Sequence, residues 1–135
     1  MTKRFFFGTN FKMYQTHAET QRFLTELIAS TQARDDLQLF LIPPFTSLAG
    51  LPEIAATAGI WIGAQNMHFA DEGEYTGAIA APMLKALNLD LVMLGHAERR
   101  KHFGETDQAL NKKLHTALGQ GLQVLLCVGE SAEDR

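Results

Sequence analysis

The chain has 135 residues, 46% of them apolar, which suits one folded domain spanning residues 1–135. A net charge of −3 with interspersed acids and bases, and no apolar window near the roughly 18 residues of a membrane span, argue against nucleic-acid and membrane partners. The single Cys127 excludes an internal disulfide and favours a reducing compartment, which we expect to be the cytoplasm, and the histidines show no metal-ligand clustering.

The N-terminal part of the chain predicts a strand, a helix and a second strand. Residues 4–10 are rich in aromatic residues and end in polar ones, as a short strand does. After Thr16, apolar residues from Phe23 to Ile28 recur on one face and charged residues on the other, which predicts an amphipathic helix. Residues 36–42 are the second predicted strand, closed by two prolines that cannot continue a sheet.

The next segment predicts a helix, a strand and a long loop. Thr46 or Ser47 is expected to cap a helix that runs to about residue 58, where Gly59 supplies a left-handed stop. Residues 60–66 are the third predicted strand. Residues 67–78 are polar, contain two glycines and are too many for a tight turn. A long ordered loop usually has a function.

The remaining elements follow the same alternation. Residues 82–87 predict a short helix with proline in its first turn, and 89–95 a nearly wholly apolar strand, as expected when both faces of a sheet are covered. Thr106 and Asp107 begin another helix, and residues 122–128 are the fifth predicted strand. Five strands with four helical connections predict repeated βα units and a parallel α/β sheet.

Such a repeat forms either an open doubly wound sheet or a closed eight-stranded barrel, and periodicity alone does not separate them. The first strand ends in Gly-Thr-Asn-Phe-Lys-Met, residues 8–13, which lacks the glycine-rich fingerprint of dinucleotide or nucleotide sites. Polar side chains collect instead where the predicted strands end, the rim at which barrels keep their active sites. This placement favours the barrel.

Lys12 and Asn10 are candidate substrate-binding residues. A lysine just beyond a strand is usually a solvated charge. Beside Asn10 at the mouth of a sheet, however, Lys12 can neutralise a phosphate or a developing enolate.

His96 and Glu98 are candidate catalytic residues at a strand-to-helix junction. A short helix beginning at Ala97 would disfavour an imidazolium at its N-terminus, so a neutral His96 could polarise a carbonyl group. Glu98 is either an acid that stabilises the helix start or a partner of Lys12 or substrate. The following two arginines are expected to form scaffold salt bridges.

Two other polar side chains have structural interpretations. Cys127 ends an apolar strand with no base nearby, so we expect a buried small side chain and not a nucleophile. Glu130 is interpreted either as an acid catalyst or as a buried ion-pair partner of one of the arginines, Arg99 or Arg100.

Five motifs resemble triosephosphate isomerase signatures in order and spacing. They are residues 8–13 (Gly-Thr-Asn-Phe-Lys-Met), 64–66 (Ala-Gln-Asn), 75–77 (Tyr-Thr-Gly), 95–100 (Gly-His-Ala-Glu-Arg-Arg) and 127–130 (Cys-Val-Gly-Glu). Together they span nearly the whole chain.

The resemblance implies a (β/α)8 TIM barrel, of which this chain covers about five strands and four helical connections. It implies cofactor-free interconversion of dihydroxyacetone phosphate and D-glyceraldehyde 3-phosphate through an enediolate. Asn10 and Lys12 would bind this small phosphorylated sugar, and Glu98 would orient His96, the neutral electrophile for which this family is the standard example. The 67–78 loop would dock into a partner, with Thr76 near the partner site, in a homodimer.

The chain also departs from the family pattern. Ala97 replaces a serine whose hydroxyl touches the resting base, Phe11 and Tyr14 replace a tryptophan and an asparagine, and Thr9 replaces a glycine. In the family the catalytic base, the lid and the phosphate loops follow the fifth strand, beyond Arg135. Two alternatives therefore stay open: a paralogous aldose-ketose isomerase for another small sugar phosphate, and a non-catalytic half-barrel that assembles with a partner.

Overall fold

The computed structural model describes residues 2–135 and shows an alternation of strands and helices. In chain order the elements are β1 (Phe5–Asn10), α1 (His17–Ser30), β2 (Leu37–Ile42), η1 (Phe45–Ser47), α2 (Leu51–Ala56), β3 (Trp61–Ala64), α3 (Ala81–Ala86), β4 (Leu91–Leu94), α4 (Ala97–Phe103), α5 (Asp107–Gly119) and β5 (Gln123–Leu126). None of the helices in residues 2–135 combines the length and apolar content that a bilayer crossing needs.

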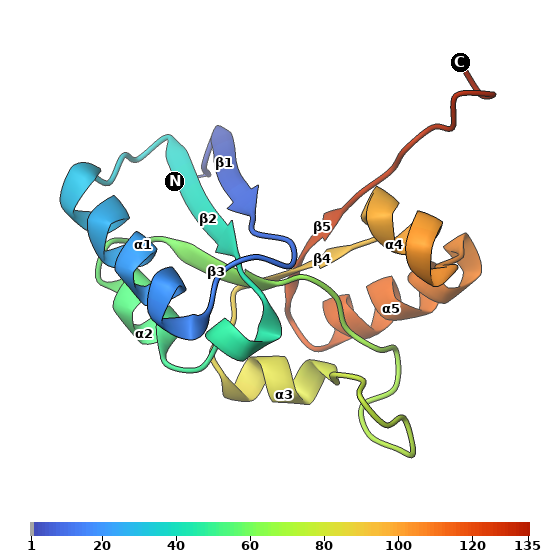
Figure 1. The fold of residues 1–135 in the computed structure, drawn as a ribbon. Helices are drawn as coiled ribbons and strands as arrows, with labels where there is room; N and C mark the ends of the chain where they lie inside the picture. Colours follow the sequence, from blue (N-terminus) through green and yellow to red (C-terminus); the bar gives the residue numbers. More distant parts are fainter. Residues whose placement is uncertain (1) are drawn as a thin grey trace.

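The five strands are parallel and lie in the order in which they occur in the chain. An open doubly wound sheet reverses its strand order at a switch point, whereas a barrel adds each strand beside the preceding one. The sheet is curled, with the helices on its outer side (Figure 1). The prediction of the first half of a parallel barrel is confirmed.

The core lies between the curled sheet and its helices. Leu24 of α1, Leu84 of α3 and Leu110 of α5 belong to one apolar cluster with Val92 of β4. All four residues of β4 are buried, which agrees with a strand covered on both faces. The edge strand β1 differs from β4, because its residues Phe5–Phe7 are exposed.

Local signals explain where α1 and α5 begin. The side chain of Thr16 accepts a hydrogen bond from the Glu19 N–H, and the Glu19 carboxylate accepts one from the Thr16 N–H, a capping box at the start of α1. Thr106 Oγ1 accepts from the Ala109 N–H at 3.2 Å and caps α5. Both predicted helix starts are confirmed.

The predicted helix from Thr46 or Ser47 to residue 58 is wrong at its start. These two residues lie in the short 3-10 turn η1, and neither caps a helix. The helix α2 begins only at Leu51, after Gly50, which has a left-handed φ of 78°. A left-handed residue interrupts a right-handed helix, so η1 and α2 stay separate.

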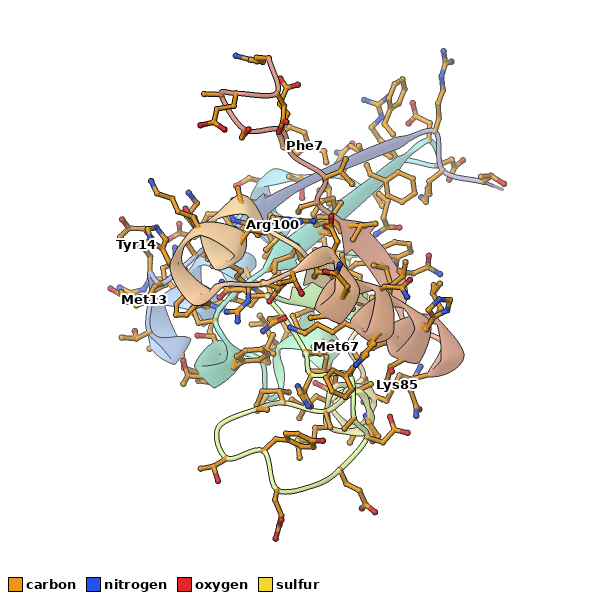
Figure 2. All side chains as sticks on the ribbon, turned by 90° about the vertical axis from the view of Figure 1, so that its right-hand side faces the viewer. Phe7, Met13, Tyr14, Met67, Lys85 and Arg100 are labelled. Carbon is orange, nitrogen blue, oxygen red and sulfur yellow. The ribbon has the colours of Figure 1, made fainter. Side chains whose placement is uncertain are left out.

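The loop between β3 and α3 projects from the body of the molecule (Figures 1 and 2). Met67 at its base is buried in the core, whereas residues 71–77 are exposed. Tyr75 packs against His68 with the two rings tilted by 47° and their centroids 4.1 Å apart. The loop is therefore ordered by its own aromatic side chains.

Candidate active site

A cavity of about 210 Å³ opens where the strands end, on the side predicted from the sequence. The residues that line it come from the ends of β1, β3 and β4 and from α4. They include Asn10, Lys12, Gln65, His96 and Glu98. Lys12, His96 and Glu98 converge on one pocket, as expected from the sequence, and Asn10 lies beside them; their binding and catalytic roles stay predictions.

Lys12 and Glu98 form an ion pair across the mouth of the cavity. Lys12 Nζ donates to Glu98 Oε1 at 2.6 Å, and the two side chains are 48% and 45% exposed. This hydrogen bond lowers the pKa of the Glu98 carboxyl and raises the pKa of the Lys12 ammonium. Both groups are therefore held in their charged forms, with the ammonium facing solvent as an anion-binding group requires. Glu98 also lies in the first turn of α4, so its two interpretations from sequence are compatible.

His96 is the N-cap residue of α4. Its Nδ1 accepts a hydrogen bond from the Glu98 N–H at 3.2 Å. A ring nitrogen that accepts carries no proton, so the proton of a neutral imidazole lies on Nε2. The helix start predicted at Ala97 is confirmed, and this geometry suits a neutral His96 that donates from Nε2.

Arg100 fixes the end of β4 to neighbouring elements. Its guanidinium donates to Gly95 O at 2.8 Å and Cys127 O at 3.3 Å, and pairs with Asp107 at 2.6 Å. Gly95 has a left-handed φ of 79°, and a Cβ there would lie 2.9 Å from Cys127 O. The turn that presents His96 therefore requires glycine. The predicted scaffold role of Arg100 is confirmed.

A buried ion network lies behind the site. The Glu105 carboxylate accepts from Arg99 Nε at 2.9 Å and from Lys113 Nζ at 3.0 Å, and Lys113 also donates to Asn66 Oδ1 at 3.0 Å. Burial acts to raise the pKa of Glu105, but the hydrogen bonds from both cations outweigh it, and the pKa is lowered. The network joins the segment after β3 to α4 and α5, so it sets the position of the helix that carries His96 and Glu98.

Glu105 and Lys113 were not predicted from the sequence. Lys113 is 8 positions from Glu105 and 47 positions from Asn66, and no local sequence pattern indicates such contacts. The only available signal was a lysine on the apolar face of the predicted helix after Thr106, where Lys113 falls next to Leu110 and Leu114.

The structure tests one interpretation of Glu130 and the expected role of Cys127. The interpretation of Glu130 as a buried ion-pair partner of Arg99 or Arg100 is wrong, and its interpretation as an acid catalyst stays a prediction. Glu130 accepts from Arg135 at 2.6 Å on the surface, because the chain beyond β5 leads away from α4 (Figure 1). Cys127 is partly buried and packs against an apolar cluster, and burial raises the pKa of its thiol, as expected for a packing residue.

Phe11 and Tyr14, the residues beside Lys12 that depart from the family pattern, do not line the cavity. Phe11 is buried and packs edge-on against Phe23, with ring centroids 5.1 Å apart. Tyr14 is 72% exposed, and it lies with Met13 at the edge of the molecule (Figure 2). Phe11 is therefore a core residue, and Tyr14 is available to solvent.

Comparison with known proteins gives consistent matches. The profile of the family described as triosephosphate isomerase matches residues 5–135. L-erythrulose-1-phosphate isomerase of Brucella abortus is 48% identical over 136 residues, which cover 100% of this chain and 53% of the relative. Triosephosphate isomerases of a Synechococcus species and of Dictyoglomus thermophilum are 44% and 42% identical, covering 93% and 98% of this chain and 51% and 53% of the relatives. The chain spans about half the length of the curated relatives it matches.

Proposed function

Because the chain belongs to the triosephosphate isomerase family, we propose that it supplies half of an aldose-ketose isomerase that interconverts dihydroxyacetone phosphate and D-glyceraldehyde 3-phosphate. The observation that carries this proposal is the convergence of Lys12, His96 and Glu98 on one cavity at the strand ends. A cation, a neutral hydrogen-bond donor and an orienting carboxylate are the groups that a developing enediolate needs.

The reaction is a proton transfer with no net gain or loss of electrons. A base removes a proton from the carbon next to the carbonyl group, the bonding electrons form a carbon-carbon double bond, and the carbonyl oxygen gains negative charge. Lys12 offsets this charge, and His96 Nε2 donates its proton to the oxygen. The hydroxyl group on the deprotonated carbon then gives its proton to His96, and the base returns a proton to the former carbonyl carbon. The carbonyl and hydroxyl groups have then exchanged carbons, and His96 and the base have regained their starting protonation states.

A neutral imidazole is suited to this donation, because its acidity lies closer to that of an enediol than the acidity of an imidazolium does. The hydrogen bond from the Glu98 N–H to His96 Nδ1 supports the required tautomer. Asn10 and Lys12 bind the substrate at the rim beside it.

Glu98 is poorly suited to act as the base. It is the one carboxylate that lines the cavity among residues 2–135, and its hydrogen bond with Lys12 lowers its pKa. A lowered pKa makes a weaker proton acceptor. We therefore infer that the base is a residue that does not line this cavity, in a segment corresponding to the part of the relatives that this chain does not span.

A second candidate substrate is L-erythrulose 1-phosphate. The relative in Brucella abortus that is named L-erythrulose-1-phosphate isomerase is 48% identical to this chain, and the two triosephosphate isomerases are 44% and 42% identical. Ala97 stands where the family resemblance leads us to expect a serine, and this departure also favours a related substrate.

We further propose a cytoplasmic homodimer, formed through the projecting 67–78 loop. Residues 71–77 are exposed at its tip, and Tyr75 packs against His68, which supports a preformed docking element. In the dimer Thr76 would lie near the partner's site. Nucleic acid and membrane are not among the proposed partners.

Initial rates of the native protein with dihydroxyacetone phosphate and with L-erythrulose 1-phosphate test the proposal. A higher kcat/KM for the triose supports the first candidate, and a higher value for the four-carbon ketose replaces it with the second. Turnover of neither substrate would refute the proposed isomerase.

A further inference from the structure

The backbone of Lys12 has a left-handed conformation, with a φ of 54°. A lysine Cβ makes this region unfavourable, so the conformation persists only where neighbouring groups hold it. One such group is the Asn10 side chain, whose Oδ1 accepts a hydrogen bond from the Lys12 N–H at 2.9 Å.

The second group is the side chain of Gln65. Its Nε2 donates to the Lys12 carbonyl oxygen at 2.7 Å, and lies 3.4 Å from Asn10 Oδ1 and 3.3 Å from the Ile42 carbonyl oxygen. The contact with Lys12 is much the shortest of the three. The amide nitrogen has two hydrogens, so the two longer contacts share the second one.

This arrangement links three neighbouring strands. Gln65 follows β3 directly, Ile42 is the last residue of β2, and Asn10 is the last residue of β1. One amide group thus reaches from β3 across β2 to the segment that carries Lys12, at the rim where the cavity opens.

We propose that Gln65 is a positioning residue of this site, holding Lys12 in its left-handed conformation through the Lys12 carbonyl oxygen. The inference rests on the proposed role of Lys12 as the cation that faces the substrate. With its N–H bonded to Asn10 and its carbonyl oxygen to Gln65, Lys12 has both backbone groups fixed by side chains. The direction of its Cα–Cβ bond, from which the side chain extends toward Glu98, is then fixed as well.

The expected effect of losing Gln65 follows from the precision that such a site needs. Displacement of a charged group by about 1 Å can lower the rate of a reaction by about 100-fold. Gln65→Leu keeps a comparable bulk but removes both hydrogens that hold the Lys12 and Asn10 oxygens. In the native protein we expect this variant to lower kcat/KM by about 10- to 100-fold.

Gln38 provides a matched control. It is also a glutamine whose Nε2 donates to backbone carbonyl groups, those of Leu39 at 3.0 Å and Gly59 at 2.8 Å. It lies near the start of β2, at the opposite end of the sheet from the cavity. Gln38→Leu should lower the melting temperature and leave kcat/KM unchanged, whereas Gln65→Leu should lower kcat/KM.

A second readout does not depend on turnover. A crystal structure of the Gln65→Leu protein, or backbone chemical shifts of residue 12, should show Lys12 outside the left-handed region. This result would support the positioning role even if neither sugar phosphate were a substrate, so the failure of the proposed function and that of this inference are distinguishable. Gln65→Met, which is similar in length and has no donor, is the second variant should Gln65→Leu not fold. A left-handed Lys12 in the folded variant, or an unchanged kcat/KM in an active one, would overturn the proposal.

Discussion

Replacing Glu105 by glutamine removes the anion of the buried network behind the site. The Glu105 side chain is 4% exposed, and its cationic partners Arg99 and Lys113 lie at 2.9 and 3.0 Å. At these distances each pair has a gross attraction of about 6 kcal/mol at an effective dielectric constant of about 20, most of which desolvation offsets. Removing one member of a buried pair typically costs about 3–5 kcal/mol. Since Lys113 keeps Asn66 as a partner and Arg99 is partly exposed, we expect Glu105→Gln to lower the free energy of unfolding by about 3 kcal/mol.

Urea denaturation of the native protein and the variant measures this loss, and its pH dependence has a definite sign. The pKa of Glu105 in the fold lies below its ordinary value of 4.5. A group of this kind contributes its full stabilisation above the unfolded pKa and loses it as the pH falls through the folded pKa. The difference between native protein and variant should therefore be constant near neutral pH and shrink below about pH 4.5.

Glu130→Gln is the control for this prediction. Its pair with Arg135 is on the surface, and such pairs contribute about 0–1 kcal/mol. A loss for Glu105→Gln no larger than for Glu130→Gln, or one that grows as the pH falls, would refute the reasoning.

Three further predictions concern the site and the loop. Lys12→Met removes the cation that offsets the enediolate and should lower kcat/KM by at least about 10²-fold in steady-state assays; unchanged kinetics would exclude that role. His96→Gln should lower kcat by about 10² to 10³-fold and change KM far less. In the native protein, nitrogen-15 NMR should show His96 with an unprotonated Nδ1 and a protonated Nε2. The opposite tautomer would contradict the proposed proton donation. Replacing residues 67–78 by a short turn should give a monomer in sedimentation velocity, and an unchanged oligomer would argue against the docking role of the loop.

The succession of strands and helices was predictable because each switch carries a local signal. Gly59, the predicted helix stop, has a left-handed φ of 67°, and Thr16 and Thr106 cap helices as expected. The pairing order of the strands was not encoded in any one segment. The barrel was favoured because polar side chains follow several strands, because residues 8–13 lack a nucleotide fingerprint, and because five motifs resemble those of a barrel family. The sequential order of the sheet now accounts for the placement of these polar side chains.

Helix α2 shows where local signals were insufficient. Thr46 and Ser47 have the side chains of capping residues, but capping requires the chain to continue as a helix. A left-handed Gly50 intervenes, and glycine adopts either hand so readily that the sequence does not indicate which one it takes.

The candidate site, like the fold, was predictable only in part. Lys12, His96 and Glu98 were predictable because each follows a strand, and parallel strands end at one rim. The contacts of Lys113 with Asn66 and of Gln65 with Lys12 were not predictable, since they join segments that only the folded sheet brings together. The contact of Glu105 with Lys113 spans eight positions at the start of α5, and no local motif indicated it.

The most direct test of the proposed isomerase is proton NMR of its candidate substrates in deuterium oxide. Incubation of the native protein with dihydroxyacetone phosphate or L-erythrulose 1-phosphate should incorporate deuterium at the carbon next to the carbonyl group as the isomeric sugar phosphate forms. The rate of deuterium incorporation and the rate at which the isomeric sugar phosphate forms should both fall by at least about 10²-fold in the Lys12→Met protein. Substrate that keeps all its carbon-bound protons and its original structure, with native protein at high concentration, would contradict the account.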